Sequence, residues 1–236
     1  MDSVSGRPPT RRLPLLSRET AAGFSALVFP VRCVGCGAAA PLGLCQECLS
    51  GLEPPSATPP PRGVEEWWAP YDYAGAWRDV VVAAKARRAR ALVALLAGAL
   101  VECVGTGLAV FPGTHPDVVT WPPTTSRRRL RRGYDPAELL ARAVARSRMC
   151  PAARLLVRDR DAPAQMGRGR RARRRGPRFT ANRSLAGFTV LVVDDVSTTG
   201  ATITASADAL HRAGAASVLA ATAARTPRPQ GTCEER

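Results

Sequence analysis

The run FTVLVVDDVSTTGAT, residues 188–202, restricts the fold of this chain more than any other stretch. Its first part is short and continuously apolar, which is typical of a strand buried on both faces of a parallel sheet. Asp194 and Asp195 follow at the carboxyl end of that strand, where open α/β sheets bind their ligands. The small residues 197–200 then predict a tight turn, and we expect a helix from about Ala201 that stops at Gly214.

The turn that follows the two acids has the composition of an anion site. Small residues let backbone amides and hydroxyl groups close around a phosphate, and a helix amino terminus favours negative charge. In such a site Asp194 and Asp195 would accept hydrogen bonds from ribose hydroxyls. The stretch therefore predicts a sugar-phosphate ligand.

This stretch has three other interpretations. A Walker B strand of an ATPase requires G-x-x-x-x-G-K-[ST] elsewhere in the chain, and the sequence has no such motif. The phospho-acceptor strand of a receiver domain does not need the Ser-Thr-Thr-Gly turn. A plain acidic turn that caps the helix through Ser197 or Thr198 stays open.

Apolar patterns along the rest of the chain alternate between strands and helices. Helices are predicted over Asp79–Val104 and from Pro136 to about Met149, and strands over Asp117–Thr120, over Arg154–Arg158 and from Ser217. This alternation predicts the α/β class, with a mostly parallel twisted sheet flanked by helices.

The segment VLVVDDVSTTGAT closely resembles the phosphoribosyl pyrophosphate motif of type I phosphoribosyltransferases. The resemblance implies that fold, with Asp194 and Asp195 as the catalytic acids that contact the ribose hydroxyls. It also implies that the following loop binds the 5′-phosphate. The ligand-binding positions are then Asp194, Asp195, Val196, Ser197, Thr198, Thr199, Gly200, Ala201 and Thr202.

Further stretches resemble ComF-type proteins, which are phosphoribosyltransferase-like and associated with DNA uptake. RRRLRRGYDPAELLARAVA, residues 127–145, is similar to a family segment, although Asp135-Pro136 replaces the family's Asn-Gln. Lys85 and Gln165 occupy two other matched positions, and the resemblance spans roughly residues 24–224. It implies a pyrophosphate-binding basic loop made of Arg127, Arg128, Arg129, Arg131, Arg132 and Gly133.

The chemistry implied by this resemblance is ribosyl phosphate transfer to an acceptor that the sequence does not identify. Pyrophosphate would leave through an oxocarbenium-like state, Mg²⁺ would bridge the pyrophosphate and sugar oxygens, and the basic loop would offset the leaving group's charge.

Four cysteines form a second motif. Cys33, Cys36, Cys45 and Cys48 make two C-x-x-C pairs, a spacing that fits structural Zn²⁺ with four thiolate ligands. Two disulfides or an iron–sulfur centre are the alternatives. ComF-type proteins often carry such an amino-terminal zinc ribbon, which agrees with the zinc interpretation.

These patterns predict the domain organisation and the location of the chain. Ala91–Val110 has the length of a membrane span, but Glu102 and three glycines interrupt it, so we expect a buried helix, no membrane span and a cytoplasmic protein. The predicted units are a disordered tail (1–23), the zinc module (24–52), a proline-rich linker (53–66), the phosphoribosyltransferase-like domain (67–226) and a second disordered tail (227–236).

Charge suggests a second functional class. The formal net charge is +15, and almost all of it is arginine because Lys85 is the single lysine. Such a chain attracts phosphates or nucleic acid. The alternative function is a non-catalytic DNA-uptake protein that binds single-stranded DNA or a helicase partner through its basic loops and zinc module. The basic run 168–178 is a cover over the site, a nucleic-acid contact or a solvated loop.

Overall fold

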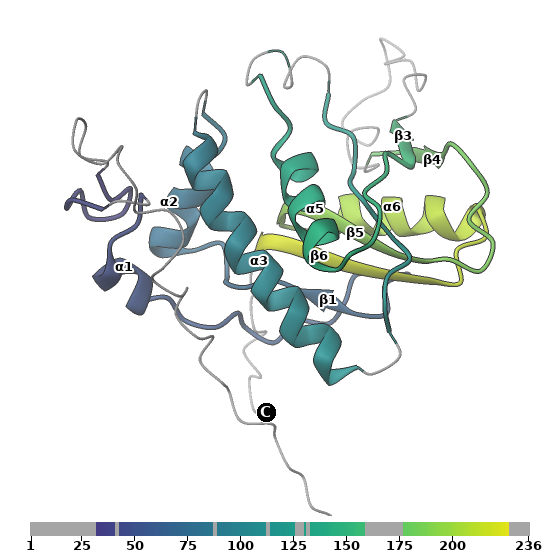
Figure 1. The fold of residues 1–236 in the computed structure, drawn as a ribbon, viewed down its shortest axis with the longest axis horizontal. Helices are drawn as coiled ribbons and strands as arrows, with labels where there is room; N and C mark the ends of the chain where they lie inside the picture. Colours follow the sequence, from purple (N-terminus) through teal and green to yellow (C-terminus); the bar gives the residue numbers. More distant parts are fainter. Residues whose placement is uncertain are drawn as a thin grey trace, which may run out of the picture.

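The computed structural model of this chain describes residues 32–40, 43–86, 89–111, 114–125, 130, 133–158 and 177–226. Its main sheet is parallel, with the strand order β1-β6-β5-β2 (Figure 1). The strands are β1 (Trp67–Trp68), β2 (Val118–Thr120), β5 (Thr189–Ser197) and β6 (Ser217–Arg225). The predicted α/β class with a mostly parallel sheet is therefore confirmed.

Strand β5 lies inside this sheet, between β2 and β6, because its side chains are apolar on both faces. Leu191 and Val193 belong to the core on one face, whereas Val190 and Val192 belong to the core on the other. All four are fully buried. A strand that buries both faces needs a helical layer on each side of the sheet.

Helices supply both layers (Figure 1). One face carries α2 (Gly75–Ala83), α3 (Arg90–Val110) and α5 (Pro136–Ser147), and the other carries α6 (Ala201–Arg212). The predicted helix from Pro136 is confirmed, and the side chain of Asp135 caps it by accepting from the Ala137 amide at 3.2 Å. The predicted helix from Ala201 is also confirmed.

Helix α3 is the one helix among the described residues that is long and apolar enough to cross a membrane. A third of its most apolar window (33%) is buried inside the protein. Val93, Leu96, Leu100 and Val104 form a buried stripe that belongs to the same core as residues of α2 and α5. Core helices of globular proteins pass the same test of length and composition, so this helix alone does not indicate a membrane span.

Two sequence predictions of local structure are wrong. The predicted single helix over Asp79–Val104 is two helices, α2 and α3, separated by a turn that contains Lys85. At the end of α2 the amides of Lys85 and Ala86 bond to the carbonyl oxygens of Val82 and Ala83, three residues back, which tightens the chain into a turn. The Tyr134 hydroxyl hydrogen-bonds to the carbonyl oxygens of Ala84 and Ala86 in this turn.

The second error concerns Arg154–Arg158, which was expected to continue the main sheet. Instead β3 (Leu156–Arg158) pairs antiparallel with β4 (Phe179–Ala181) in a separate two-stranded sheet. The preceding chain reaches the main sheet through an isolated bridge between Ala152 and Val119 and through a hydrogen bond from the Leu155 amide to the Thr120 hydroxyl at 3.2 Å. Phe179 of β4 is buried in the core on the α6 side of the main sheet. The small sheet of β3 and β4 therefore packs against that core and does not extend the main sheet beyond β2.

The amino-terminal part of the described chain packs onto the α2–α3 side. Residues 32–52 include the short helix α1 (Gln46–Ser50), and Cys33 and Leu44 are buried in the same core as Trp77. Residues 56–66, which we call the strap, lead into β1. The Glu65 amide of the strap donates a hydrogen bond to the carbonyl oxygen of Val218 in β6. The predicted tails 1–23 and 227–236 lie outside the described residues.

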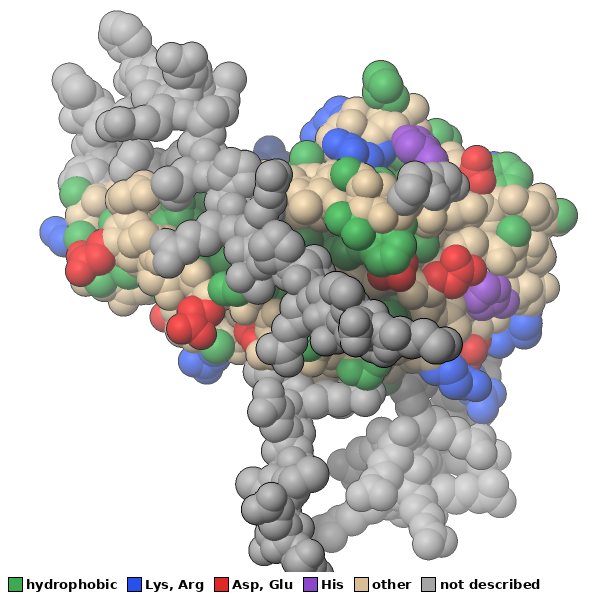
Figure 2. Space-filling model, turned by 90° about the horizontal axis from the view of Figure 1, so that it is seen from below, with side chains coloured by type: hydrophobic (Ala, Val, Ile, Leu, Met, Phe, Trp, Pro, Cys, Tyr) green, Lys and Arg blue, Asp and Glu red, His purple; other side chains and the backbone are tan. Residues whose placement is uncertain are grey.

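Charged side chains of the described residues are mixed in sign on the face shown in Figure 2. Most of the arginines that produce the net charge belong to segments outside the described residues, including the basic run 168–176. The charge excess of the sequence is therefore not a property of the described core.

Candidate functional site

Asp194 and Asp195 lie near the carboxyl end of β5, as the sequence predicted. An Asp194 carboxylate oxygen accepts a hydrogen bond from the Asp195 amide at 2.8 Å, and Asp195 accepts one from the Val196 amide at the same distance. Each acid therefore uses one oxygen locally. The two side chains are held at the edge of the sheet where parallel folds bind ligands.

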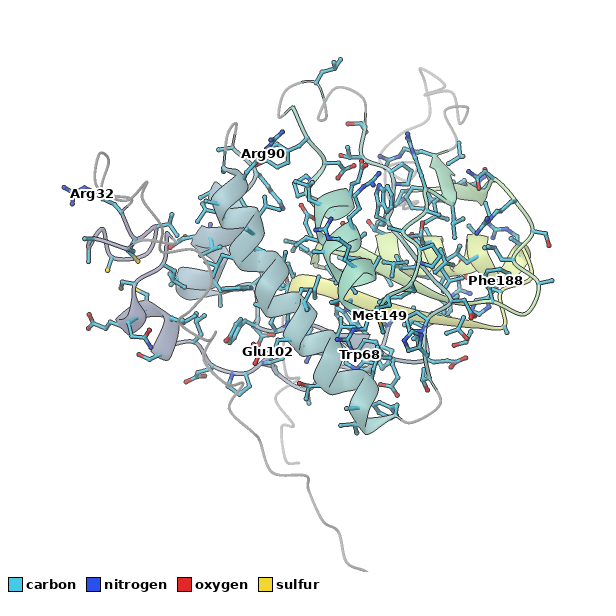
Figure 3. All side chains as sticks on the ribbon, viewed as in Figure 1. Arg32, Trp68, Arg90, Glu102, Met149 and Phe188 are labelled. Carbon is cyan, nitrogen blue, oxygen red and sulfur yellow. The ribbon has the colours of Figure 1, made fainter. Side chains whose placement is uncertain are left out.

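Lys85 contacts this pair from the turn that follows α2. Its ammonium Nζ lies 3.1 Å from Oδ2 of Asp195, and both side chains are largely withdrawn from water. Lys85 lies in the turn that follows α2, and α3 begins at Arg90, which Figure 3 labels. The structure thus brings together Lys85 and Asp195, two residues that the sequence analysis singled out separately.

Burial changes the ionisation of two acids in this region. Loss of water contact raises the pKa of Asp194 well above its usual value, and the charge of Asp195 raises it further. Burial also raises the pKa of Asp135, while the amides of Thr124 and Ala137 oppose that rise and the charge of Asp195 adds to it. Asp135 is therefore electrostatically linked to Asp195, although the sequence analysis noted it only as a departure from the family motif.

The loop after the acids turns sharply into α6. Ser197 is buried, and Gly200 has a left-handed backbone conformation, with φ of 73°, that favours glycine. The Thr199 hydroxyl accepts from the Ala201 amide at 3.4 Å. The loop opens onto a cavity of about 280 Å³. Its lining consists of Thr58, Pro59, Pro61, Arg62, Trp67, Thr198, Thr199, Gly200, Thr204 and Thr226.

The strap forms the outer wall of this cavity, and buried polar contacts hold it there. The amide and hydroxyl of Ser56 both donate to one oxygen of Asp72, at 3.0 and 2.6 Å. The guanidinium of Arg225 donates to the Ser56 carbonyl and lies over the Trp67 ring, 5.1 Å from its centre. Sequence reasoning missed Asp72, Arg225 and the strap as parts of this region, because the proline run indicated only an extended segment.

The lining of the cavity suits a phosphorylated ligand. Threonine hydroxyls and the amino terminus of α6 provide hydrogen-bond donors, and Arg62 adds a positive charge. The hydroxyl oxygen of Thr226 is buried without a hydrogen-bond partner. Among the described lining residues there is no acid that would repel an anion.

Six of the predicted site residues lie outside the described residues: Arg127, Arg128, Arg129, Arg131, Arg132 and Gln165. Gly133 is described, is exposed and has a left-handed backbone with φ of 80°. It lies directly before Tyr134, whose hydroxyl contacts the Lys85 turn.

Cys33, Cys36, Cys45 and Cys48 converge as the spacing predicted. Their sulfur atoms all lie within 4.8 Å of one another, which fits tetrahedral binding of one Zn²⁺. Hydrogen bonding from the Cys36 amide lowers the pKa of Cys33 to about 6, whereas the neighbouring sulfurs, Cys33 first, raise the pKa of Cys48 to about 12. A cation bound among the four sulfurs would offset their negative charge and favour the thiolate forms.

The family model for the phosphoribosyl transferase domain matches residues 130–235. This match covers α5, the Asp194–Asp195 strand, the loop and α6. Together with the parallel sheet flanked by helices, it defines a type I phosphoribosyltransferase fold, preceded by a four-cysteine cluster that is compatible with a zinc ribbon. At the level of the domain, the match supports a phosphoribosyltransferase-like function.

The chain is also similar to solved structures of low sequence identity. Glutamine phosphoribosylpyrophosphate amidotransferase from B. subtilis is 24% identical over 51% of this chain, with a TM-score of 0.34. Purine phosphoribosyltransferase from Pyrococcus horikoshii is 17% identical over 56% of this chain and 76% of its own, with a TM-score of 0.35. Hypoxanthine phosphoribosyltransferase from Trypanosoma cruzi is 14% identical over 61% of this chain and 82% of its own, with a TM-score of 0.37.

This chain spans only 25% of the length of the B. subtilis enzyme. No curated protein matches the sequence significantly. The fold assignment rests on the sheet and the family model.

Proposed function

We propose that this chain is a ComF-type phosphoribosyltransferase-like protein that binds phosphoribosyl pyrophosphate with Mg²⁺ and transfers its ribosyl phosphate to an acceptor. The observation that carries the proposal is the junction of β5 and α6. There, Asp194 and Asp195 stand beside Lys85, and the next turn opens onto a cavity rich in hydroxyl groups. Both acids and the turn lie within the matched phosphoribosyl transferase domain.

In this proposal different residues bind different parts of the ligand. The Asp194 and Asp195 carboxylates accept hydrogen bonds from the ribose hydroxyls. The amides and hydroxyls of residues 196–202 hold the 5′-phosphate. Lys85 and the basic loop Arg127, Arg128, Arg129, Arg131, Arg132 and Gly133 offset the charge of pyrophosphate as it leaves an oxocarbenium-like sugar. Gln165 is proposed as a further ligand contact from the family resemblance.

The residues present fit Mg²⁺ only in part. Asp194 and Asp195 offer carboxylate oxygens, which Mg²⁺ prefers, but Oδ2 of Asp195 already pairs with Lys85 at 3.1 Å. The protein side therefore supplies few free oxygens, and most ligands to the ion would come from the phosphates and sugar of the bound molecule. When bound, Mg²⁺ would neutralise charge on the pyrophosphate.

The remaining parts of the proposal concern the module and the location. We propose that Cys33, Cys36, Cys45 and Cys48 hold structural Zn²⁺ within residues 24–52, and that the protein acts in the cytoplasm. The linker of the predicted organisation includes the strap, which closes one side of the proposed ligand site.

The proposal is tested by titration calorimetry with phosphoribosyl pyrophosphate and Mg²⁺. The wild-type chain is expected to bind, and the double variant Asp194→Asn, Asp195→Asn is expected to lose binding. Asp79→Asn is the matched control, because Asp79 lies on α2 and outside the cavity lining. Retained binding in the double variant, or no binding by well-folded wild type, would overturn the proposal. Confirmed binding would justify a screen of acceptors.

The second candidate is the non-catalytic DNA-uptake protein, which the arginine content favours. Its contacts would come from the basic runs 127–132 and 168–178, most of which lies outside the described residues. Single-stranded DNA affinity that falls steeply with salt and survives the Asp194→Asn, Asp195→Asn change would support it. Absence of such affinity at low salt would exclude it.

A further inference from the structure

The turn that carries Lys85 is fastened by a residue from another part of the chain. The Tyr134 hydroxyl lies 2.6 Å from the carbonyl oxygen of Ala84 and 2.9 Å from that of Ala86. These two carbonyls flank Lys85 in the sequence. A phenol has one hydrogen to donate, so the two carbonyls share or exchange it. Tyr134 itself is only 8% exposed, and its ring packs in the core shared by α2, α3 and α5.

The position of Tyr134 explains why it is rigid enough to hold the turn. It directly precedes Asp135, the capped start of α5, and α5 packs against β5. Asp195 belongs to that same strand. Tyr134 and Asp195 are therefore anchored to one rigid unit, and the Lys85 turn is attached to that unit at two points: the phenol and the carboxylate.

We infer that Tyr134 is a positioning residue that holds the Lys85 turn so that the ammonium faces Asp195. Phenylalanine at this position would fill the same space but would leave the Ala84 and Ala86 carbonyls without this donor. A backbone carbonyl that loses its partner in a partly buried place favours another conformation of the turn. The lysine would then spend less time beside Asp195. Only the consequence for ligand binding rests on the proposed function; the ion pair itself does not.

The sequence offers a direct readout, because Lys85 is the only lysine in the chain. Labelling with an amine-reactive reagent, followed by peptide mass mapping, reports on this one side chain and separates it from the terminal amine. An ammonium held against a carboxylate reacts slowly. We expect Tyr134→Phe to label Lys85 several-fold faster than wild type. Tyr73→Phe is the matched control, because Tyr73 is half-buried elsewhere in the domain, and it is expected to label at the wild-type rate.

A double variant separates positioning from a general loss of stability. Asp195→Asn alone is expected to speed labelling of Lys85, and Tyr134→Phe added to it is expected to change the rate little, because the shared interaction is already gone. Independent, multiplying effects would mean that Tyr134 does not act through the ion pair. A wild-type labelling rate in Tyr134→Phe would overturn the inference outright.

Calorimetry with phosphoribosyl pyrophosphate and Mg²⁺ tests the ligand half. Tyr134→Phe is expected to weaken binding about three- to tenfold, as expected for one hydrogen bond, and to have no effect in the Asp195→Asn background. Unchanged affinity together with faster labelling would overturn the expected effect of Tyr134 on ligand binding, but not its role in positioning Lys85. If wild type does not bind, the proposed function fails, while the labelling rates still decide whether Tyr134 positions Lys85.

Discussion

The ammonium of Lys85 lies 3.1 Å from the carboxylate of Asp195 and joins the turn between α2 and α3 to the central strand of the sheet. Both side chains are largely buried, so salt screens this pair less than a surface ion pair. The pair places a positive charge directly beside the two acids of the candidate site.

Removing that positive charge is expected to weaken ligand binding. Lys85→Gln keeps most of the side chain's length but leaves Asp194 and Asp195 without a cation as an anionic ligand arrives. We expect affinity for phosphoribosyl pyrophosphate with Mg²⁺ to fall about tenfold or more, measured by calorimetry. Arg142→Gln is the control, since Arg142 pairs with Glu138 on the exposed side of α5. Equal affinities for Lys85→Gln and wild type would contradict a role for Lys85 in binding.

Neutralising Asp194 is expected to stabilise the fold while it abolishes binding. The folded-state pKa of Asp194 is raised by burial and by Asp195, so its ionised form disfavours folding. Its contribution to stability is full below the unfolded pKa of about 4 and is lost as pH rises through the higher folded pKa. Asp194→Asn keeps an acceptor for the Asp195 amide.

The pH dependence of unfolding measures this effect. At pH 7 Asp194→Asn is expected to raise the free energy of unfolding, and the gain is expected to vanish near pH 4. Asp208→Asn, at an exposed ion pair, is expected to show no such gain. A destabilised Asp194→Asn at pH 7 would show that burial does not control this carboxyl.

The stability that the strap contributes is expected to depend on its buried contact with Asp72 more than on its exposed ion pair with Asp208. Arg225 is 7% exposed and lies beside Asp72, which also accepts both hydrogen bonds from Ser56. Asp72→Ala removes these partners and leaves a buried guanidinium, with an expected loss of about 3 kcal/mol in chemical denaturation. Arg62→Ala breaks the exposed pair with Asp208 and is expected to cost less than about 1 kcal/mol. A larger loss of stability in Arg62→Ala than in Asp72→Ala would show that the exposed ion pair, and not the buried contact, holds the strap.

Gly200 is expected to tolerate no side chain. Its φ of 73° disfavours alanine, and a Cβ there would stand 3.3 Å from the Pro61 ring of the strap. Gly187 has a similar φ of 79° but open space around it, so Gly187→Ala measures the backbone cost alone, about 1 kcal/mol. We expect Gly200→Ala to lose more stability than this control and to weaken ligand binding as well. Equal losses of stability in Gly200→Ala and Gly187→Ala would mean that Pro61 moves away from the added Cβ at no cost in stability.

Zinc removal is expected to loosen the helical side of the domain as well as the module. Cys33 and Leu44 are buried with Trp77, and a Cβ at Gly35 would stand 3.1 Å from the Ala76 side chain, so the module and α2 are in close contact. We expect about one zinc ion per chain by metal analysis. Chelation or Cys36→Ser is expected to lower the melting temperature, whereas Cys150→Ser, a cysteine outside the cluster, is expected to leave zinc content unchanged. Zinc-free protein of full stability would contradict a structural metal.

Local patterns in the sequence predicted the parts of this protein whose physics is local. The apolar run before Asp194 indicated a strand buried on both faces, and β5 has buried residues on both. Asp135 and Pro136 predicted a helix start, because a capping carboxylate and a fixed proline φ act within one turn. The cysteine spacing likewise predicted the cluster, since each C-x-x-C turn brings its own two sulfurs close within four residues.

Contacts between distant segments decided the rest. No pattern near Lys85 shows that Tyr134 would bond to the turn there, and only the packing of α5 on the sheet brings that hydroxyl to the turn. Likewise the strap looked like a linker, because prolines favour an extended chain in any setting. Its place at the cavity follows from Asp72 and Arg225, which the folded sheet brings to it. The sequence by itself thus determined the strand, the acids and the cysteine cluster. The tertiary structure decided which residues face them, because that depends on long-range packing that no local stretch encodes.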